Sequence, residues 1–162
     1  MATSIRTHRR GYTLIELLVV LGILGLLATM AMPLAEMTVQ RERERELKRA
    51  LWQIRDALDA YKAARDQGAI VGPVGSSGYP ASLSVLTQAA ADARPDHRGE
   101  VLRFLRAIPR DPFADPELPP ERSWGLRSYA TEADDPKPGV DVYDVHSQSD
   151  RVGLNGVPLR RW

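Results

Sequence analysis

Few residues of this chain could carry catalysis, and their spacing does not build a catalytic site. The histidines are His8, His97 and His146. If residues 140–147 form a strand, Asp144 and His146 lie on one face and Ser147 on the other, because strand side chains alternate. A Ser-His-Asp relay needs all three side chains to converge, and the histidines lack the spacing of zinc ligands. We therefore predict that the protein is not an enzyme.

The composition excludes further classes of protein. The chain has 162 residues, 22 Lys plus Arg against 21 Asp plus Glu, and no cysteine. Without cysteine it has no disulfide, thiolate zinc site or cysteine nucleophile. Nearly balanced charge argues against a generally basic nucleic-acid binder, so we expect no nucleic-acid partner. The length suits one small folded domain.

One carboxylate, Glu16, stands inside the most apolar part of the chain, residues 12–32. Twenty-one helical residues span roughly 32 Å, about the thickness of a bilayer core. Three arginines and no acidic residue precede the run, which places the N-terminus in the cytoplasm and the rest outside. A cleaved secretory signal is disfavoured because the run is too long and lacks an Ala-x-Ala site. A plain membrane anchor leaves Glu16 unexplained, because an isolated charge in the bilayer is costly.

The residues around Glu16 resemble a specific signal. Arg9-Arg10-Gly11, followed by Tyr12-Thr13-Leu14-Ile15-Glu16 and the apolar run, is similar to the class III signal of type IV pilins and type II secretion pseudopilins. The resemblance implies cleavage after Gly11, methylation of the new amine at Tyr12, and pairing of Glu16 with the amine of a neighbouring subunit. The family usually has Phe where this chain has Tyr12. A simpler alternative is that Glu16 lies near a membrane face and reaches water.

A second helix, expected at residues 36–65, follows Pro33. Its apolar residues recur in steps of four and three and predict one buried face: Leu47, Leu51, Ile54, Leu58 and Tyr61. The alternating charges of residues 41–46 predict a solvated helix face. Pro33 lacks an N–H and is expected to kink or melt the helix, either to assist assembly or only to mark the membrane boundary.

The rest of the chain predicts a small sheet packed on this helix. Residues 68–80 have loop composition, short helices are expected at 82–91 and 99–107, and strands at 126–131 and 140–147. Ile108-Pro109-Arg110-Asp111-Pro112, Trp124-Gly125 and residues 140–147 resemble the G-type, or major, pseudopilin. That resemblance implies an α+β, type IV pilin-like fold. It divides the chain into a cleaved leader (1–11), a transmembrane and filament-core helix (12–32) and a periplasmic head (33–162).

G-type pseudopilins commonly hold calcium in the C-terminal loop, which makes Asp144, Ser147 and Asp150 weak candidate ligands here. The acid-rich run that calcium needs is missing, so no metal or other cofactor is favoured.

The resemblance implies a structural subunit of the type II secretion pseudopilus, anchored in the bacterial inner membrane. Its partners would be further copies in a helical filament, other pseudopilins, the prepilin peptidase/methyltransferase, the inner-membrane assembly platform and the lipid bilayer. Two alternatives stay open. One is a type IV pilin or minor pilin for adhesion, motility or DNA uptake, although the chain lacks the cysteine pair of many pilins. The other is a membrane-anchored periplasmic enzyme or binding module.

Overall fold

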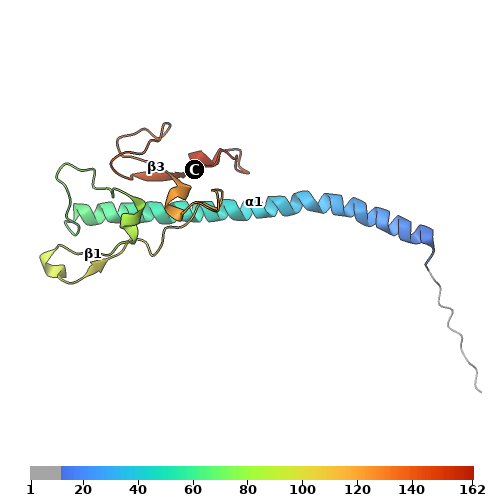
Figure 1. Ribbon diagram of the computed structural model, residues 1–162, viewed down its shortest axis with the longest axis horizontal. Coiled ribbons are helices and arrows are strands. Elements are labelled where there is room, and N and C mark those ends of the chain that lie inside the picture. Colours follow the sequence, from blue (N-terminus) through green and yellow to red (C-terminus); the bar gives the residue numbers. More distant parts are fainter. Residues whose placement is uncertain (1–11) are drawn as a thin grey trace, which may run out of the picture. The chain divides into compact units, whose positions relative to one another are not determined.

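A computed structural model describes residues 12–162, and for residues 30–35 it describes the backbone alone. The predicted leader, residues 1–11, lies outside the described residues. The chain divides into two units, Met1–Gln40 and Arg41–Trp162, and the second unit, called the head below, contains the sheets. The fold is α+β: a long N-terminal helix with small antiparallel sheets (Figure 1), as predicted.

The helix α1 spans Leu14–Asp66 and crosses the boundary between the two units. It is helical through Pro33, so the predicted melting there is wrong for the backbone. A proline removes one hydrogen bond, and the turns on either side keep theirs. The helix ends in a Schellman motif, in which Gly68 has φ 73° and the Ala69 N–H donates to the Ala64 carbonyl over 2.9 Å.

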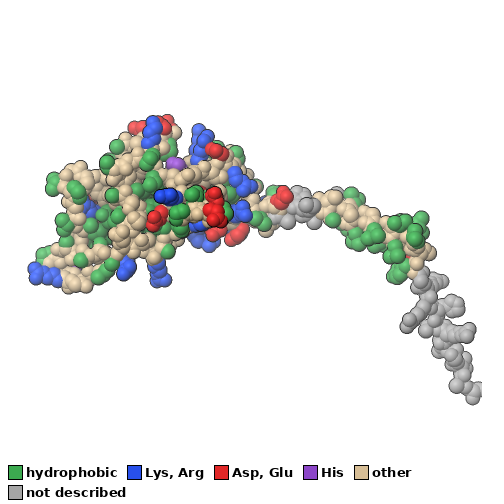
Figure 2. Space-filling view, viewed as in Figure 1, with side chains coloured by type: hydrophobic (Ala, Val, Ile, Leu, Met, Phe, Trp, Pro, Cys, Tyr) green, Lys and Arg blue, Asp and Glu red, His purple; other side chains and the backbone are tan. Residues whose placement is uncertain are grey.

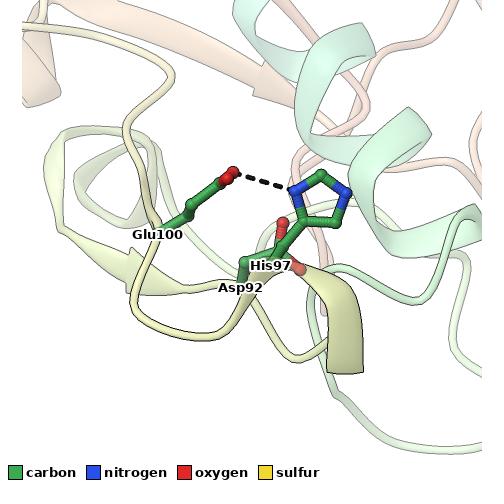
Figure 3. A group of neighbouring side chains, drawn as sticks. All are labelled: Asp92, His97 and Glu100. Atoms are coloured by element: carbon green, nitrogen blue, oxygen red, sulfur yellow. Dashed lines mark hydrogen bonds and ion pairs between the residues drawn. The ribbon is translucent and has the colours of Figure 1, made fainter.

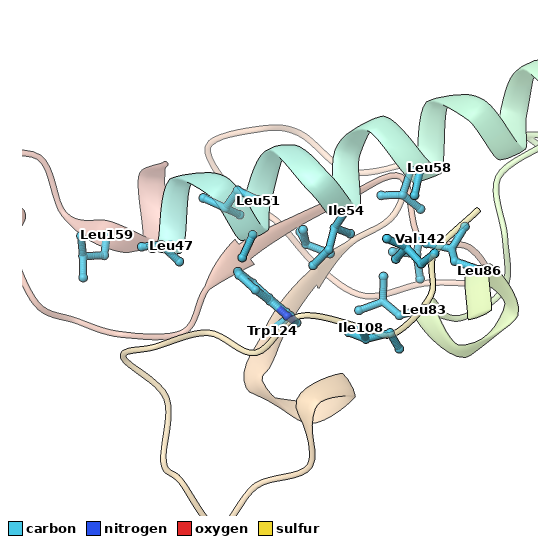
Figure 4. Packing of buried hydrophobic residues seen from close by; sticks show 14 residues of the cluster. Leu47, Leu51, Ile54, Leu58, Leu83, Leu86, Ile108, Trp124, Val142 and Leu159 are labelled. Carbon is cyan, nitrogen blue, oxygen red and sulfur yellow. The ribbon is translucent and has the colours of Figure 1, made fainter. Parts of the chain in front are cut away.

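The predicted apolar stripe of α1 forms the centre of the head's core. Leu47, Leu51, Ile54 and Leu58 are buried and Tyr61 packs against them, which confirms the four-three periodicity. Figure 4 shows this helix face meeting side chains from several later segments, among them Leu83, Ile108 and Leu159, with Trp124 beneath the helix. The other buried apolar residues of the cluster are Ala50, Ala57, Leu83, Leu86, Leu105, Ile108, Val142, Val145 and Leu159.

The short helix expected at 82–91 is present only as a five-residue 3-10 helix, and the helix expected at 99–107 is wrong. The first region holds a 3-10 turn, Leu83–Thr87, and then the strand β1, Ala90–Ala91. The second holds the strand β2, Val101–Leu102, which pairs antiparallel with β1. Proline at position 95 and the φ of 93° at Gly99 turn the chain between them, and neither segment is long enough to sustain a helix by itself.

The strand expected at 126–131 begins two residues earlier and ends at residue 127, and the strand expected at 140–147 is shortened to its second half. The strand β3, Trp124–Arg127, pairs antiparallel with β4, Asp144–Ser147. The pairing stops at Ser128 because the chain binds a side chain there instead. The buried Asp141 carboxylate accepts hydrogen bonds from the Ser128 hydroxyl (2.6 Å) and the Tyr129 N–H (2.9 Å). These bonds hold together the loop that joins β3 to β4.

A buried polar cluster joins the turn at residues 109–113 to the 3-10 helix Pro120–Ser123 and to the end of β4. Asp111 is fully buried, and its carboxylate accepts hydrogen bonds from the Ser147 hydroxyl (2.6 Å) and the Phe113 N–H (2.7 Å). Its own N–H donates to the Ser123 hydroxyl, and the Trp124 indole N–H donates to the Pro109 carbonyl. The Pro-Arg-Asp-Pro turn is therefore fixed to the edge of the sheet by side chains rather than by strand pairing.

Two charged residues of α1 bind the C-terminal segment. Glu44 was expected on a solvated face but is buried, and its Oε1 accepts the Leu154 N–H at 2.8 Å. Arg55 donates to the Asp144 carboxylate (2.8 Å) and to the main-chain oxygens of Val145 and Trp162. Each interaction spans about 90 residues or more of sequence, which is why local charge patterning gave no sign of it.

Candidate functional site

The start of α1 is closed by a reciprocal pair, Thr13 and Glu16. The Thr13 N–H donates a hydrogen bond to Glu16 Oε2 (3.1 Å). In return, the Glu16 N–H donates to the Thr13 hydroxyl oxygen (3.3 Å). This is a capping box, which satisfies helix N–H groups that have no partner within the helix. Thr-x-x-Glu before an apolar run is its sequence signature, so this local role was readable. This local role is additional to the two predicted for Glu16, pairing with a neighbouring subunit or a position near a membrane face.

The predicted processing residues lie directly before this cap. Gly11 lies outside the described residues. Tyr12 is non-helical and 82% exposed. Tyr12 lies two residues before Leu14, the first residue of α1.

The first part of α1, residues 14–27, presents apolar side chains on all sides. Figure 2 shows hydrophobic side chains over its surface. Between Leu14 and Leu27, eleven large apolar residues are more than half exposed: Leu14, Ile15, Leu17, Leu18, Val19, Val20, Leu21, Ile23, Leu24, Leu26 and Leu27. A helix that is apolar all round is stable only inside an apolar environment. Within the part of the chain that the structure describes, no helix has a stretch long and apolar enough to cross a membrane.

The three weak calcium candidates each have another partner. Asp144 binds Arg55 at 2.8 Å and Arg127 at 3.3 Å. Ser147 is fully buried and donates to the carboxylate of the polar cluster described above. Asp150 is largely exposed and binds Arg160 at 3.2 Å. The structure therefore does not bring the three together as a ligand set.

A different group of possible ligands lies in the β1–β2 turn. One ligand atom each from Asp92, His97 and Glu100 falls within 4.8 Å of the others. Figure 3 shows the His97 ring beside Glu100, with Nδ1 3.0 Å from the carboxylate. Asp92 faces Arg94, which binds both carboxylate oxygens, the closer at 2.6 Å. A carboxylate held by a guanidinium is a poor metal ligand, so this cluster serves to shape the turn.

The pKa values of two buried carboxyl groups, Asp92 and Asp141, lead us to expect that the folded state loses stability in acid. The hydrogen bond from Arg94 lowers the pKa of Asp92 from 3.8 to about 2, although burial opposes it. Burial raises the pKa of Asp141, but hydrogen bonds from Ser128, Ser77 and Tyr129 outweigh it and leave that pKa below its ordinary value. Both carboxyl groups bind a proton less readily in the folded state than in the unfolded state. Their contribution to the stability of the folded state is therefore complete above about pH 4 and is lost as the pH falls towards 2.

We therefore expect the urea midpoint of the detergent-purified chain to fall between pH 5 and pH 2.5. In Asp92→Asn the fall should be smaller, because that residue no longer titrates. An identical fall in the variant would show that Asp92 does not contribute.

The possible catalytic trio of β4 is arranged as the alternation predicts. Val145 and Ser147 are buried while Asp144 and His146 are half-buried on the other face. Burial lowers the pKa of His146, and Asp144 raises it in part. His146 Nδ1 lies 3.2 Å from the Ser147 main-chain oxygen, while the Ser147 hydroxyl donates to Asp111. The trio does not form a relay.

Comparison with known proteins supports the N-terminal signal. Residues 6–32 match the family model of the prokaryotic N-terminal methylation motif. The match includes the predicted cleavage position, the methylated residue and Glu16. No curated protein and no solved structure matches the chain. The motif supports a type IV pilin-like chain and points to a structural subunit rather than an enzyme.

Proposed function

We propose that this protein is a structural subunit of the type II secretion pseudopilus. The observation that carries the proposal is the methylation motif at residues 6–32, whose apolar part forms the start of α1, the helix that continues into the folded head. The motif is shared by pilins and pseudopilins. The pseudopilus is preferred because Pro109-Arg110-Asp111-Pro112 and the β4 sequence resemble the G-type subunit, and because the chain lacks cysteine.

In this proposal the apolar helix has two environments. It first lies in the inner membrane, with the head in the periplasm, and the prepilin peptidase then cuts after Gly11 and methylates the amine of Tyr12. The assembly platform moves the subunit from the bilayer into a filament, where contacts with other helices replace contacts with lipid. Glu16 enters an apolar core, where a carboxylate needs a cationic partner. The amine of a neighbouring Tyr12 supplies that partner, and growth of the filament drives protein export.

The intact mass of the protein purified from its native membrane tests the processing step. We expect the loss of residues 1–11 and the gain of one methyl group. Gly11→Val should keep the leader, because the added side chain obstructs the peptidase. A wild-type chain that keeps Met1 to Gly11 where the native peptidase is active would overturn the proposal. The protein would instead be identified as a type IV pilin by two results together. The processed chains would build surface fibres, and a strain that lacks the protein would still export proteins normally.

A further inference from the structure

A cavity of about 610 Å³ opens on the head beside a cluster of three tyrosine rings. Its wall, which defines what we call the tyrosine cavity, is formed by Lys62 of α1 and by residues from three later segments, 75–79, 128–130 and 140–141. A volume of this size is typical of a pocket that holds a small ligand.

Two of the three tyrosine rings, Tyr79 and Tyr129, line the cavity. These two rings stack at an interplanar angle of 23°, with their centroids 6.1 Å apart, and the Tyr143 ring meets both in a T-shaped contact at 5.0 and 5.4 Å. Tyr129 is nevertheless 62% exposed, so part of its ring surface is open. An open aromatic ring that is held by its neighbours offers a fixed surface on which a ligand can stack.

The polar groups around the cavity favour a ligand without charge. Among the residues that the structure describes, none forms a hydrogen bond with the hydroxyl groups of the three tyrosines, so these groups are available to a ligand. The charged groups already have partners. Lys62 binds Asp66, and the buried Asp141 carboxylate accepts hydrogen bonds from Ser128 and Tyr129. A phosphate or carboxylate would have to compete for a paired cation, whereas a neutral ligand rich in hydroxyl groups would not.

The wall of the cavity is held in place by the fold itself. The Val142 N–H donates to the Pro80 carbonyl at 2.8 Å, which joins the ends of two of the wall segments. Gly78 has φ 87°, and a side chain at this position would come within 2.8 Å of the Lys62 stem, so the loop lies directly on α1. A site that is already ordered costs less entropy to occupy than one that must first be ordered.

We propose that the tyrosine cavity binds a short uncharged oligosaccharide. A sugar ring presents C–H groups that stack on an aromatic face, and hydroxyl groups that exchange hydrogen bonds with phenol hydroxyls. A proline-rich peptide is the nearest alternative, because it also binds aromatic-lined grooves. Insertion of a proline ring between two faces needs about 7 Å, or two contacts of roughly 3.5 Å each. The rings of Tyr79 and Tyr129 are closer than that, so the saccharide is favoured.

Isothermal titration of the full-length chain tests this site, in a detergent that has no sugar headgroup. The probes are cellotetraose, chitotetraose and a proline decapeptide. We expect saturable binding of at least one saccharide and about tenfold weaker binding by Tyr129→Ala, which removes the stacking ring. Tyr129→Phe keeps the ring and should lie between the two. Trp52→Ala is the matched control and should bind like the wild type, because Trp52 is 66% exposed and does not line the cavity.

A second variant, Val140→Arg, keeps the test valid if Tyr129→Ala folds poorly. Val140 lines the cavity and is 89% exposed, so a larger side chain there should narrow the cavity without disturbing the core, and should weaken binding severalfold. Binding of neither saccharide contradicts the proposal, as does binding of the proline peptide alone. Saccharide binding that Tyr129→Ala and Val140→Arg leave unchanged places the ligand elsewhere and also overturns it. None of these results bears on the proposed function, which the intact mass tests separately.

Discussion

Replacing Asp111 by alanine is expected to destabilise the head by about 2–4 kcal/mol, because a buried and a partly buried donor lose their acceptor at once. The Ser147 hydroxyl and the Phe113 N–H both donate to this carboxylate, and a buried donor left unpaired costs about 1–3 kcal/mol. The loss lies at the junction of the Pro-Arg-Asp-Pro turn with β4. Urea unfolding of the detergent-purified chain, followed by tryptophan fluorescence, measures it, since Trp124 is in the core next to this cluster.

Asp115→Ala is the matched control for Asp111. Asp115 belongs to the same loop and also accepts a main-chain N–H, from Glu117 at 3.0 Å, but it is exposed. Its loss should change stability by less than about 1 kcal/mol, because water replaces the bond. Asp111→Asn should fall between the two, since an amide keeps one acceptor and the Ser147 hydroxyl can accept from its NH2 group. Equal effects of the two alanine substitutions would contradict the role assigned to the buried cluster.

The parts of the fold that follow from local repeats were predictable. The stripe from Leu47 to Tyr61 has a period that only a helix satisfies, and it is the core. The strands β1 and β2 have two residues each, too short for any alternation to be read. The turn between them brings the two strands together. Next to them, the Leu86 carbonyl accepts a hydrogen bond from the main-chain N–H of Leu105. Long-range pairing of this kind leaves no local sequence pattern.

The polar contacts show the same limit more sharply. Glu44 belongs to an alternating charged run, and nothing nearby distinguishes it from Glu42. It is buried because Leu154, 110 residues later, donates to it. Arg55 lies beside the apolar stripe, and its side chain joins β4 to the C-terminal residue, a contact that no local pattern indicates. Such residues are determined by tertiary packing, whereas the methylation motif is a contiguous signal and was readable.

Glu16 has two separable roles, and a pair of substitutions is expected to distinguish them. Glu16→Gln keeps the capping box, because glutamine at this position can also accept the Thr13 N–H. It removes the charge that the proposed filament pairs with a neighbouring amine. We therefore expect Glu16→Gln chains to be inserted and cut after Gly11 as in the wild type, but to form few filaments. An amine facing a neutral amide in an apolar core lacks the charged partner that its burial requires.

Glu16→Ala loses both the charge and the cap, and the lost cap costs a further ~1 kcal/mol at the helix start. Filament yield after shearing, together with intact mass, measures assembly and processing in the same sample. Thr13→Ala is the complementary variant, because it removes the hydroxyl from the cap and leaves the carboxylate. If charge pairing governs assembly, Thr13→Ala should assemble far better than Glu16→Gln. If Glu16→Gln assembles like the wild type while Glu16→Ala and Thr13→Ala both fail, the cap is the functional feature and the pairing of Glu16 with a neighbouring amine is wrong.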